Sequence, residues 1–393
     1  MDYKDDIAIV MRTFWPVSPV VGAGMLRVAE WLSSKYKCRV ITQNQADLYG
    51  VLKSERRGRN IRFSAFYAFS TSSSSFLIRV FDLLWFGLAA LISLVIHRPK
   101  LVYVATDPPL FVPFVVYVYA SLFKAKYIYH IQDIHPEASA IVFPKFKGLP
   151  FKLLRWLDAL IVSRASTVIT LTKEMEESLK ERGINVPKKI YFINNPSAKI
   201  EPLEDGSSNK FDYCFLGNLG RLQHMPLLIE VIQRYLHNGG IATFSFAGGG
   251  VYSEKIASMS KMFPNNVFYF GKVSVSQATS ITLSSNWALL PIEDDVCRYA
   301  FPSKTSSYAL SGTSILCVCG AHTNVAKWVS KNGLGRVVSP DVESLLSFFT
   351  NADAGSISPR PQKDEIKKYL AINYSENNFV TNIQNIFSDQ ISV

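Results

Sequence analysis

The chain has 393 residues, of which 48% are hydrophobic, 13% are aromatic and only 19% are charged. This length predicts two or three domains, and the apolar content excludes a disordered chain. Residues 1–200 hold 27 basic and 15 acidic side chains, whereas the rest of the chain is nearly neutral and the net charge is +11. We therefore expect the N-terminal half to face an anionic partner.

The cysteines and the first residues point to a cellular compartment. The five cysteines are odd in number and include no CxxC pair, which indicates a reducing environment. The first six residues are acidic and lead directly into an apolar run, so no signal peptide is expected. Both observations predict a protein of the cytoplasm.

Short β-rich runs alternate with helical patterns through the first half, which is typical of parallel α/β folding. We expect strands at 7–11, 39–42, 101–105, 127–132, 167–170 and 189–193. We expect helices at 24–34, 76–96, 109–123, 150–164 and 173–182. The charge-free runs 83–96 and 108–123 are shorter than the ~20 residues that cross a bilayer. They predict buried helices, either partly membrane-facing or ordinary core helices.

A segment rich in Pro, Ser, Glu, Asp and Gly predicts a linker at 197–210, between domains at 1–196 and 211–363. The alternation then resumes, with expected strands at 213–216, 243–247, 267–270, 287–291, 314–319 and 335–338. The tail 364–393 has helix-like spacing. The expected fold class is α/β, with two Rossmann-like doubly wound domains.

Glycine-rich turns follow the first strand of each domain, at the sheet edge where α/β proteins bind ligands. Gly22 and Gly24 precede a helix whose free amides favour an anion, although a tight turn explains these glycines almost as well. Later in the chain, Gly248 and Gly249 follow another strand. Their amides either face a nucleotide or simply form a turn.

The run 217–221 contains Gly217, Asn218, Gly220 and Arg221 after a strand of the second domain. The Arg221 guanidinium suits a diphosphate; a solvated surface arginine is the alternative. Pro302 and Ser303 suit a helix start, which puts Lys304 in the first turn, where the helix dipole disfavours a cation. A bound anion explains this lysine, and solvation of its side chain is the alternative.

Titratable side chains cluster after the strand at 127–132: His130, Asp133, His135 and Glu137. Such a cluster at a strand's carboxyl end is a candidate site, and its spacing fits no common zinc pattern. Asp107 follows the strand at 101–105 and is either a site residue or a helix cap.

Together these motifs resemble glycosyltransferase family 4 of the GT-B fold, and within it the WbuB-like bacterial transferases of lipopolysaccharide, O-antigen or capsule assembly. The resemblance covers nearly the whole chain. It is carried by the runs 104–109, 132–137, 217–221, 247–250 and 302–304, followed by Ser311 and Gly312.

The resemblance implies a nucleotide-sugar donor, usually a UDP-sugar, on the C-terminal domain, an acceptor on the N-terminal domain, and transfer in the cleft that they face. It also implies a C-terminal helix that crosses back to the first domain, retention of anomeric configuration, and no cofactor or metal. Donor-binding residues would be Gly22, Gly24, Gly217, Asn218, Gly220, Arg221, Gly248, Gly249, Pro302, Ser303, Lys304 and Ser307. Acceptor-binding residues would be Asp107, His130 and Glu137. Catalytic residues would be Asp133, His135, Arg221 and Lys304, the last two stabilising the departing diphosphate.

Two departures from the family pattern concern the donor. The family's paired glutamates fall near Tyr299 and on Ser307 here, which puts ribose recognition by a glutamate in doubt. The lysine that usually follows the Gly-Arg pair is missing from 223–226, which strengthens Lys304 as the phosphate lysine.

The basic, apolar first domain predicts an anionic membrane surface and a lipid-linked glycan acceptor as partners, with no nucleic acid. The docking element would be 76–96, with Arg79, Arg98 and Lys100 near its ends; a core helix with solvated ends is the alternative. The enzyme would sit peripherally at the inner face of the cytoplasmic membrane. A nucleotide-sugar epimerase and a catalytically silent membrane scaffold are the competing functions.

Overall fold

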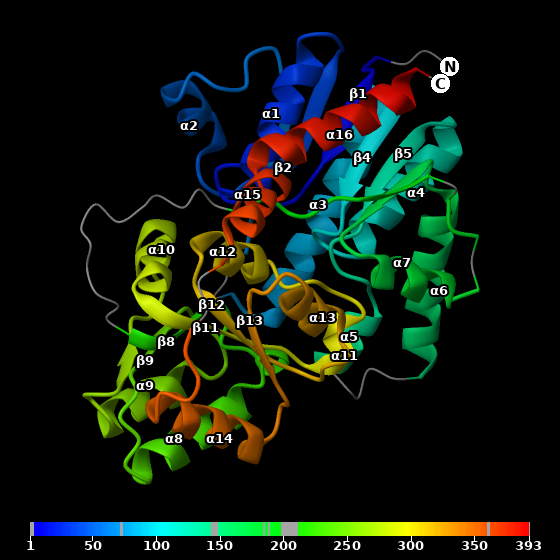
Figure 1. Ribbon diagram of the computed structural model, residues 1–393. Coiled ribbons are helices and arrows are strands. Elements are labelled where there is room, and N and C mark those ends of the chain that lie inside the picture. The colour runs from blue at the N-terminus through cyan, green and yellow to red at the C-terminus, as the bar shows by residue number, and fades with distance from the viewer. Residues whose placement is uncertain are drawn as a thin grey trace. The chain divides into compact units, whose positions relative to one another are not determined.

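The computed structural model describes residues 4–70, 74–142, 148–183, 185–187, 189–197, 211–359 and 362–392. The chain forms two compact units (Figure 1). Unit 1 contains Met1–Pro196 and Tyr374–Val393, and unit 2 contains Ser197–Asn373. The predicted linker 197–210 lies outside the described residues except for Ser197.

Unit 1 is built on a seven-stranded parallel sheet with the order β3-β2-β1-β4-β5-β6-β7. Its strands are β1 (Ile7–Val10), β2 (Cys38–Asn44), β3 (Arg62–Tyr67), β4 (Leu101–Ala105), β5 (Lys126–His130), β6 (Thr167–Thr170) and β7 (Ile190–Phe192). The central strands β1 and β4 are completely buried, as expected for a parallel sheet covered on both faces.

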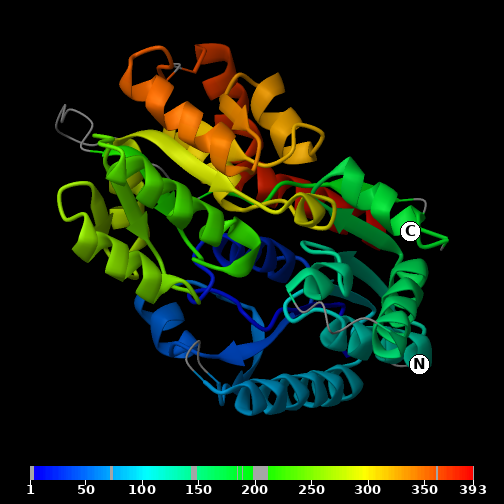
Figure 2. The same cartoon turned by 90° about the horizontal axis from the view of Figure 1, so that it is seen from below.

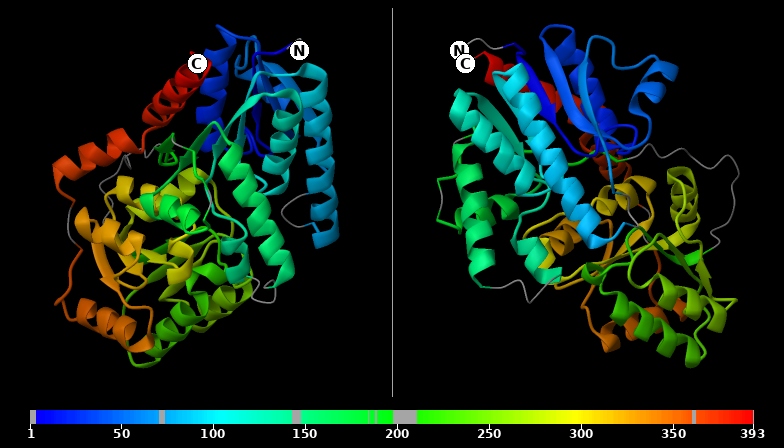
Figure 3. Two further views of the ribbon diagram at one scale, coloured as in Figure 1. Left: turned by 90° about the vertical axis from the view of Figure 1, so that its right-hand side faces the viewer. Right: turned by 180° about the vertical axis from the view of Figure 1, so that it is seen from behind.

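The helices of unit 1 include a segment from the end of the chain. They are α1 (Val21–Ser33), α2 (Leu48–Ser54), α3 (Phe76–His97), α4 (Phe111–Phe123), α5 (Glu137–Val142), α6 (Leu149–Arg164), α7 (Lys173–Lys180) and α16 (Glu376–Ile391). Helix α16 lies along α1 (Figure 3). The return of the C-terminal helix to the first domain is therefore as predicted.

Unit 2 has a six-stranded parallel sheet with the order β10-β9-β8-β11-β12-β13. The strands are β8 (Phe211–Leu216), β9 (Phe244–Ala247), β10 (Val267–Tyr269), β11 (Ser285–Pro291), β12 (Ser314–Val318) and β13 (Gly335–Val338). The helical segments are η1 (Arg221–Gln223), α8 (Met225–His237), α9 (Ser253–Met262), α10 (Val275–Leu283), α11 (Asp294–Cys297), α12 (Lys304–Ser311), α13 (Asn324–Lys331), α14 (Val342–Asp353) and α15 (Asp364–Asn373).

Both sheets are parallel α/β sheets, so the predicted fold class is confirmed. The sequence reasoning missed one strand, β3, which lies at the sheet edge and has no fully buried residue. It also treated 364–393 as one returning tail. Instead, α15 belongs to unit 2, and α16 starts anew at Ser375, whose side chain accepts a hydrogen bond from the backbone N–H of Asn378.

The strand orders fix where ligands can bind. In each sheet, successive strands are added outward from the centre first on one side and then on the other. The order reverses between β1 and β4 in unit 1, and between β8 and β11 in unit 2. Loops after neighbouring strands diverge at such switch points and leave a crevice at the carboxyl edge. The candidate residues of both units lie near this edge, at the ends of strands, in the loops that follow them or at the starts of the next helices.

Candidate active site

Two glycine loops of unit 2 pack backbone against backbone. The Gly217 N–H donates to the Ala247 carbonyl at 2.8 Å, and the Leu219 N–H donates to the Gly249 carbonyl at 2.9 Å. Gly248 has φ +136°, and a Cβ there would lie 1.8 Å from the Gly217 oxygen. Only glycine permits this approach.

This packing corrects part of the expected donor contacts. The Gly217 and Gly248 N–H groups donate to the carbonyls of Ala247 and Gly271, so neither is free for a nucleotide. Gly217 and Asn218 are nonetheless exposed at the loop surface. A Cβ on Gly220 would lie 2.6 Å from the Asn218 side chain, so Gly220 gives that side chain room.

Lys304 is the most unusual residue of unit 2. Its Nζ is buried without a hydrogen-bond partner among the described residues. It lies 3.8 Å from the centroid of the Phe215 ring, and 3.4 Å from where a Gly217 Cβ would be. Desolvation lowers the pKa of Lys304 to about 7. Aromatic faces attract cations, but a buried ammonium without a hydrogen-bond partner is costly, so Lys304 remains the candidate residue for an anion.

The start of α12 presents Lys304 to the glycine loop. Pro302 and Ser303 form the turn before the helix, and the Pro302 carbonyl accepts from the N–H and the hydroxyl of Thr305. Ser303 provides no side-chain cap. The helix-start prediction is correct, and the Thr305 N–H in its first turn is already used by the Pro302 carbonyl.

Arg221 and Ser307 differ in their surroundings. Arg221 begins η1, is exposed, and has no ion pair or hydrogen bond within the part of the chain that the structure describes. The Ser307 hydroxyl lies 3.1 Å from that of Ser197. Ser307 therefore contacts the first residue of unit 2, and the donor contact expected of it stays a prediction.

Sequence reasoning missed an acidic loop after β11. His224 Nδ1 lies 3.0 Å from the Glu293 carboxylate, and the Glu293 N–H donates to the Leu222 carbonyl. The Asp294 carboxylate accepts from the Gly320 N–H at 2.7 Å. These residues join the loops after β8, β11 and β12. The sequence does contain a signal for this loop, because an apolar strand is followed closely by the acidic residues Glu293, Asp294 and Asp295.

In unit 1 the structure corrects the expected role of His130. This side chain is completely buried, with Nδ1 2.5 Å from the Tyr103 hydroxyl. Burial lowers the pKa of His130 to about 4. A neutral, inaccessible imidazole in the core cannot contact an acceptor.

Glu137 is also committed to the fold. Its carboxylate pairs with Arg182 and, at 3.2 Å, with Arg155. Arg182 also pairs with the buried Asp158. These pairs tie α5 and α6 to Arg182, which lies just beyond the end of α7. An acceptor would have to break a buried ion pair to use Glu137, so the predicted acceptor contact is wrong.

Asp107 joins two loops of unit 1. Its carboxylate accepts from the Thr13 N–H at 3.0 Å, and its carbonyl accepts from the Arg12 N–H at 3.2 Å. Asp107 thus links the loop after β4 to the loop after β1, rather than capping the helix that follows it. It is only partly buried, so its second carboxylate oxygen stays a candidate acceptor contact.

Asp133 and His135 lie in the loop after β5. Asp133 keeps contact with solvent, although desolvation by the surrounding protein raises the pKa of its carboxyl. His135 Nδ1 is 2.8 Å from the Ser139 hydroxyl, and its carbonyl accepts from Arg182 at 2.9 Å. Burial and the Arg182 charge lower the pKa of His135 to about 4. His135 is therefore a neutral hydrogen-bonding group at physiological pH.

The two glycines after β1 are explained by packing. A Cβ on Gly22 would lie 2.7 Å from the Trp15 backbone nitrogen, and the Gly22 N–H donates to the Ser18 hydroxyl. A Cβ on Gly24 would lie 2.8 Å from the Phe379 ring of α16. The structure thus gives Gly24 a helix-packing role, which corrects its assignment to the donor.

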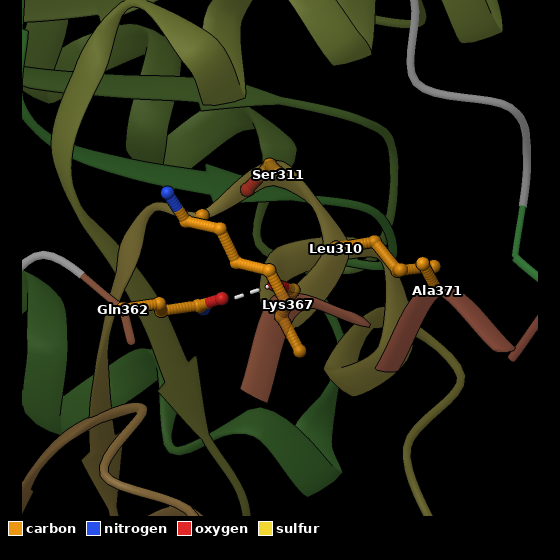
Figure 4. Close-up of a pocket in the computed structure, with 7 residues that line it drawn as sticks. Leu310, Ser311, Gln362, Lys367 and Ala371 are labelled. Carbon is orange, nitrogen blue, oxygen red and sulfur yellow. Dashed lines mark hydrogen bonds between the residues drawn. The ribbon is translucent and has the colours of Figure 1, made fainter. Parts of the chain in front are cut away.

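Unit 2 also contains a separate pocket of about 420 Å³ at the carboxyl end of α12, the end opposite Lys304 (Figure 4). It is lined by Ala309, Leu310, Ser311, Gly312, Gln362, Lys367 and Ala371. The Gln362 amide donates to the Ala309 carbonyl at 2.9 Å. Among the described residues, no group of three or more His, Cys, Asp or Glu side chains is arranged to hold a metal ion.

Comparisons with known proteins place this geometry in context. No family model matches the chain. The chain is 26% identical over 299 residues to a Pseudomonas aeruginosa protein named "Probable glycosyltransferase WbjE", covering 71% of this chain and 72% of that protein.

Solved structures resemble the whole chain. Sucrose-phosphate synthase from Thermosynechococcus elongatus has a TM-score of 0.72 at 12% identity, over 98% of this chain and 99% of its own. HepE from Anabaena, solved with UDP, has a TM-score of 0.67 at 12% identity, over 98% and 100%. WaaG, a glycosyltransferase of lipopolysaccharide biosynthesis, has a TM-score of 0.59 at 13% identity, over 97% and 99%.

The chain is a glycosyltransferase with the GT-B fold. Unit 1 is then the N-terminal domain of the transferase, and unit 2 is its C-terminal domain. The buried lysine, the exposed arginine and the glycine loops all belong to the C-terminal domain, whereas Asp107, Asp133 and His135 belong to the N-terminal one.

Proposed function

We propose that this transferase moves a sugar, a hexose or an N-acetylaminosugar, from a UDP-sugar to a lipid-linked glycan in cell-surface polysaccharide synthesis. The single observation that carries the proposal is Lys304, whose buried Nζ has no partner among the described residues. The UDP bound to HepE and the lipopolysaccharide role of WaaG support the donor and the pathway. The enzyme would act in the cytoplasm at the inner membrane face, as a member of glycosyltransferase family 4.

In the proposed mechanism, Lys304 and Arg221 stabilise the negative charge that develops on the leaving diphosphate. Lys304 acts from a desolvated position where its charge is most effective. Arg221 is exposed, and its guanidinium can donate two parallel hydrogen bonds to the diphosphate oxygens. These two cations would perform the charge stabilisation without a divalent metal.

His135 and Asp133 would lie beside the donor sugar. His135 is neutral and is held by Ser139 and Arg182, so it offers a hydrogen bond to a sugar hydroxyl. The proposed reaction retains the anomeric configuration by attack on the face from which UDP departs. In that geometry the β-phosphate can accept the proton of the acceptor hydroxyl.

The test is a panel of UDP-sugars, with thermal shift and UDP release measured with and without membrane lipid extract. We expect one donor to stabilise the protein, and UDP release to require lipid. Lys304→Met removes an unpaired buried ammonium, so it should abolish UDP binding yet stabilise the unliganded protein by about 1 to 3 kcal/mol. Lys261→Met, at an exposed lysine of the same unit, is the matched control.

The competing functions give different results. Conversion of the donor sugar without any acceptor would favour a nucleotide-sugar epimerase. Vesicle binding without any response to nucleotides would favour a silent scaffold and contradict the roles given to Lys304 and Arg221.

A further inference from the structure

Helix α3 is apolar on both of its faces. Its inner face belongs to the core, where Phe86, Ala90 and Leu94 are completely buried. Its outer face exposes Leu77, Ile78, Phe81, Leu84, Trp85, Leu88, Ile92, Val95 and Ile96. Figure 2 shows α3 as a long, straight helix on the outside of unit 1. Helices of soluble proteins usually carry polar side chains on the outer face, so this continuous apolar strip needs a partner.

The helix cannot cross a membrane without leaving the fold. By length and composition, it is the one helix among the described residues that could span a bilayer. However, Asp82 on its inner face is completely buried and pairs with Arg12 at 2.8 Å. The same carboxylate accepts from Gln43 and from the Phe69 N–H. Because these contacts fix the inner face to the sheet, only the outer face is available to a partner.

An aromatic cluster surrounds the amino end of α3. The Phe69 ring makes edge contacts with Tyr67, Phe81 and Trp85 at centroid distances of 4.9, 5.4 and 5.9 Å. The Trp85 ring N–H donates to the Tyr67 carbonyl at 3.2 Å. All four side chains are exposed. Tryptophan and tyrosine favour the boundary between lipid tails and water.

The charges around the strip match an anionic lipid surface. Arg79 is exposed, whereas Asp82 is the only acidic residue of α3 and is buried. Arg98 follows the helix directly, and Lys100 comes two residues later and pairs with Asp6 at 3.3 Å. A second apolar strip lies on α6, with Leu149, Leu153 and Trp156 exposed beside Lys152. Helix α4 contacts both α3 and α6. Apolar side chains flanked by cations are typical of surfaces that rest on anionic bilayers.

We propose that the outer face of α3 and its aromatic cluster lie in the interface of an anionic lipid bilayer, with the helix parallel to the membrane. The cluster follows the carboxyl end of β3, so it lies at the sheet edge that also carries Asp107 and His135. Docking in this orientation brings the acceptor edge of unit 1 to the lipid surface. The inference rests on the proposed function only for the identity of the acceptor.

The test is flotation of the full-length protein with vesicles that contain no glycan lipid. Vesicles of phosphatidylcholine alone are compared with vesicles that also contain phosphatidylglycerol. We expect binding to the anionic vesicles, release by salt, and a blue shift of Trp85 fluorescence that is lost in Trp85→Phe. Phe81→Ser combined with Leu88→Ser should weaken binding about tenfold or more.

The matched control is Ile241→Ser combined with Val251→Ser, which changes two apolar residues of unit 2 that are more exposed than Phe81 and Leu88. This variant should bind vesicles like the wild type. Circular dichroism and the thermal shift with UDP show that the α3 variant is folded and that its donor site is intact.

Equal vesicle binding by the wild type and the α3 variant would overturn the proposal. The proposal would also be overturned if light scattering shows a dimer that the α3 substitutions dissociate, and the wild type does not bind vesicles. Loss of the UDP response with vesicle binding intact would instead count against the donor assignment alone.

Discussion

At the scale of single residues, Lys304 carries the pH dependence that we expect of the proposed donor site. Its ammonium lies over the Phe215 ring and beside Gly217 with no acceptor among the described residues. In the unfolded chain the lysine keeps its ordinary pKa near 10.5, whereas desolvation lowers the pKa of Lys304 in the folded protein to about 7. Folding therefore releases its proton between these two values of pH.

This difference predicts a pH dependence with a definite sign. Between about pH 7 and 10 the unfolded chain holds a proton that the unliganded fold does not, so this group makes the protein more stable as pH rises. In the proposed complex, a bound diphosphate would restore the proton to Lys304. Affinity for UDP should therefore fall by up to about tenfold per pH unit above pH 7.

Calorimetry of UDP binding in buffers with different ionisation enthalpies measures the proton uptake directly. Lys304→Arg, which stays charged throughout, should lose the pH dependence. A wild-type affinity that is flat from pH 7 to 9 would show that Lys304 does not meet the diphosphate.

The position of Lys304 in a first helical turn, where the helix dipole opposes a cation, was correctly expected from the sequence. Its contact with a diphosphate stays a prediction. The acceptor contacts expected of His130 and Glu137 were wrong. Both types are frequent in sites, but whether a side chain points into the core or finds a buried partner such as Arg182 depends on tertiary packing that spacing along the chain does not contain.

At the scale of elements, Asp82 holds α3 on the sheet of unit 1. It accepts hydrogen bonds from Ser70, Gln43 and the Phe69 N–H, and it pairs with Arg12. Burial alone would raise the pKa of Asp82, but these hydrogen bonds and the Arg12 charge lower it overall. The carboxylate therefore stabilises the fold above its ordinary pKa of 3.8, and this contribution is lost as the pH falls through its lower folded value.

Asp82→Asn should lower the free energy of unfolding by about 2 to 4 kcal/mol at neutral pH, because it leaves Arg12 without its charge partner. The difference in the free energy of unfolding between the variant and the wild type should become smaller in acid, because Asp82 itself becomes neutral there. Urea unfolding at neutral and acidic pH measures both effects. Glu230→Gln, which breaks the exposed Glu230–Arg234 pair, is the control and should cost less than about 1 kcal/mol. Equal effects of the two variants would contradict a special role for Asp82.

The sequence was most informative about buried elements. All six strands of unit 2 were expected within two residues of their observed positions, because short, mostly apolar runs alternate with helical patterns there. The edge strand β3 was missed, since Arg62 and Ser64 interrupt its apolar pattern and only its pairing with β2 makes it a strand. The helix α3 was expected at 76–96 and is observed at Phe76–His97, with Arg79 exposed and Asp82 held by buried partners.

At the scale of the whole molecule, the chain completes its first unit with its last helix. The buried side chains of α16 belong to the same core as α1 and β1: Phe379, Val380, Ile383, Ile386 and Phe387. Gly24 lets α1 approach the Phe379 ring closely. Burial of one large apolar side chain contributes about 1.5 to 3 kcal/mol. Five of them are comparable with the about 5 to 15 kcal/mol that separates a folded domain from its unfolded state.

Ending the chain after Asn373 should therefore unfold unit 1 and leave unit 2 folded. Differential scanning calorimetry should show that the truncated protein loses one of two transitions, and UDP should still raise the temperature of the remaining one, because Lys304 and the glycine loops belong to unit 2. Removal of only the residues after Ile391 is the control and should keep both transitions. A truncated chain that retains both transitions at wild-type temperatures would mean that α16 covers unit 1 without contributing to its stability, which its five buried side chains argue against.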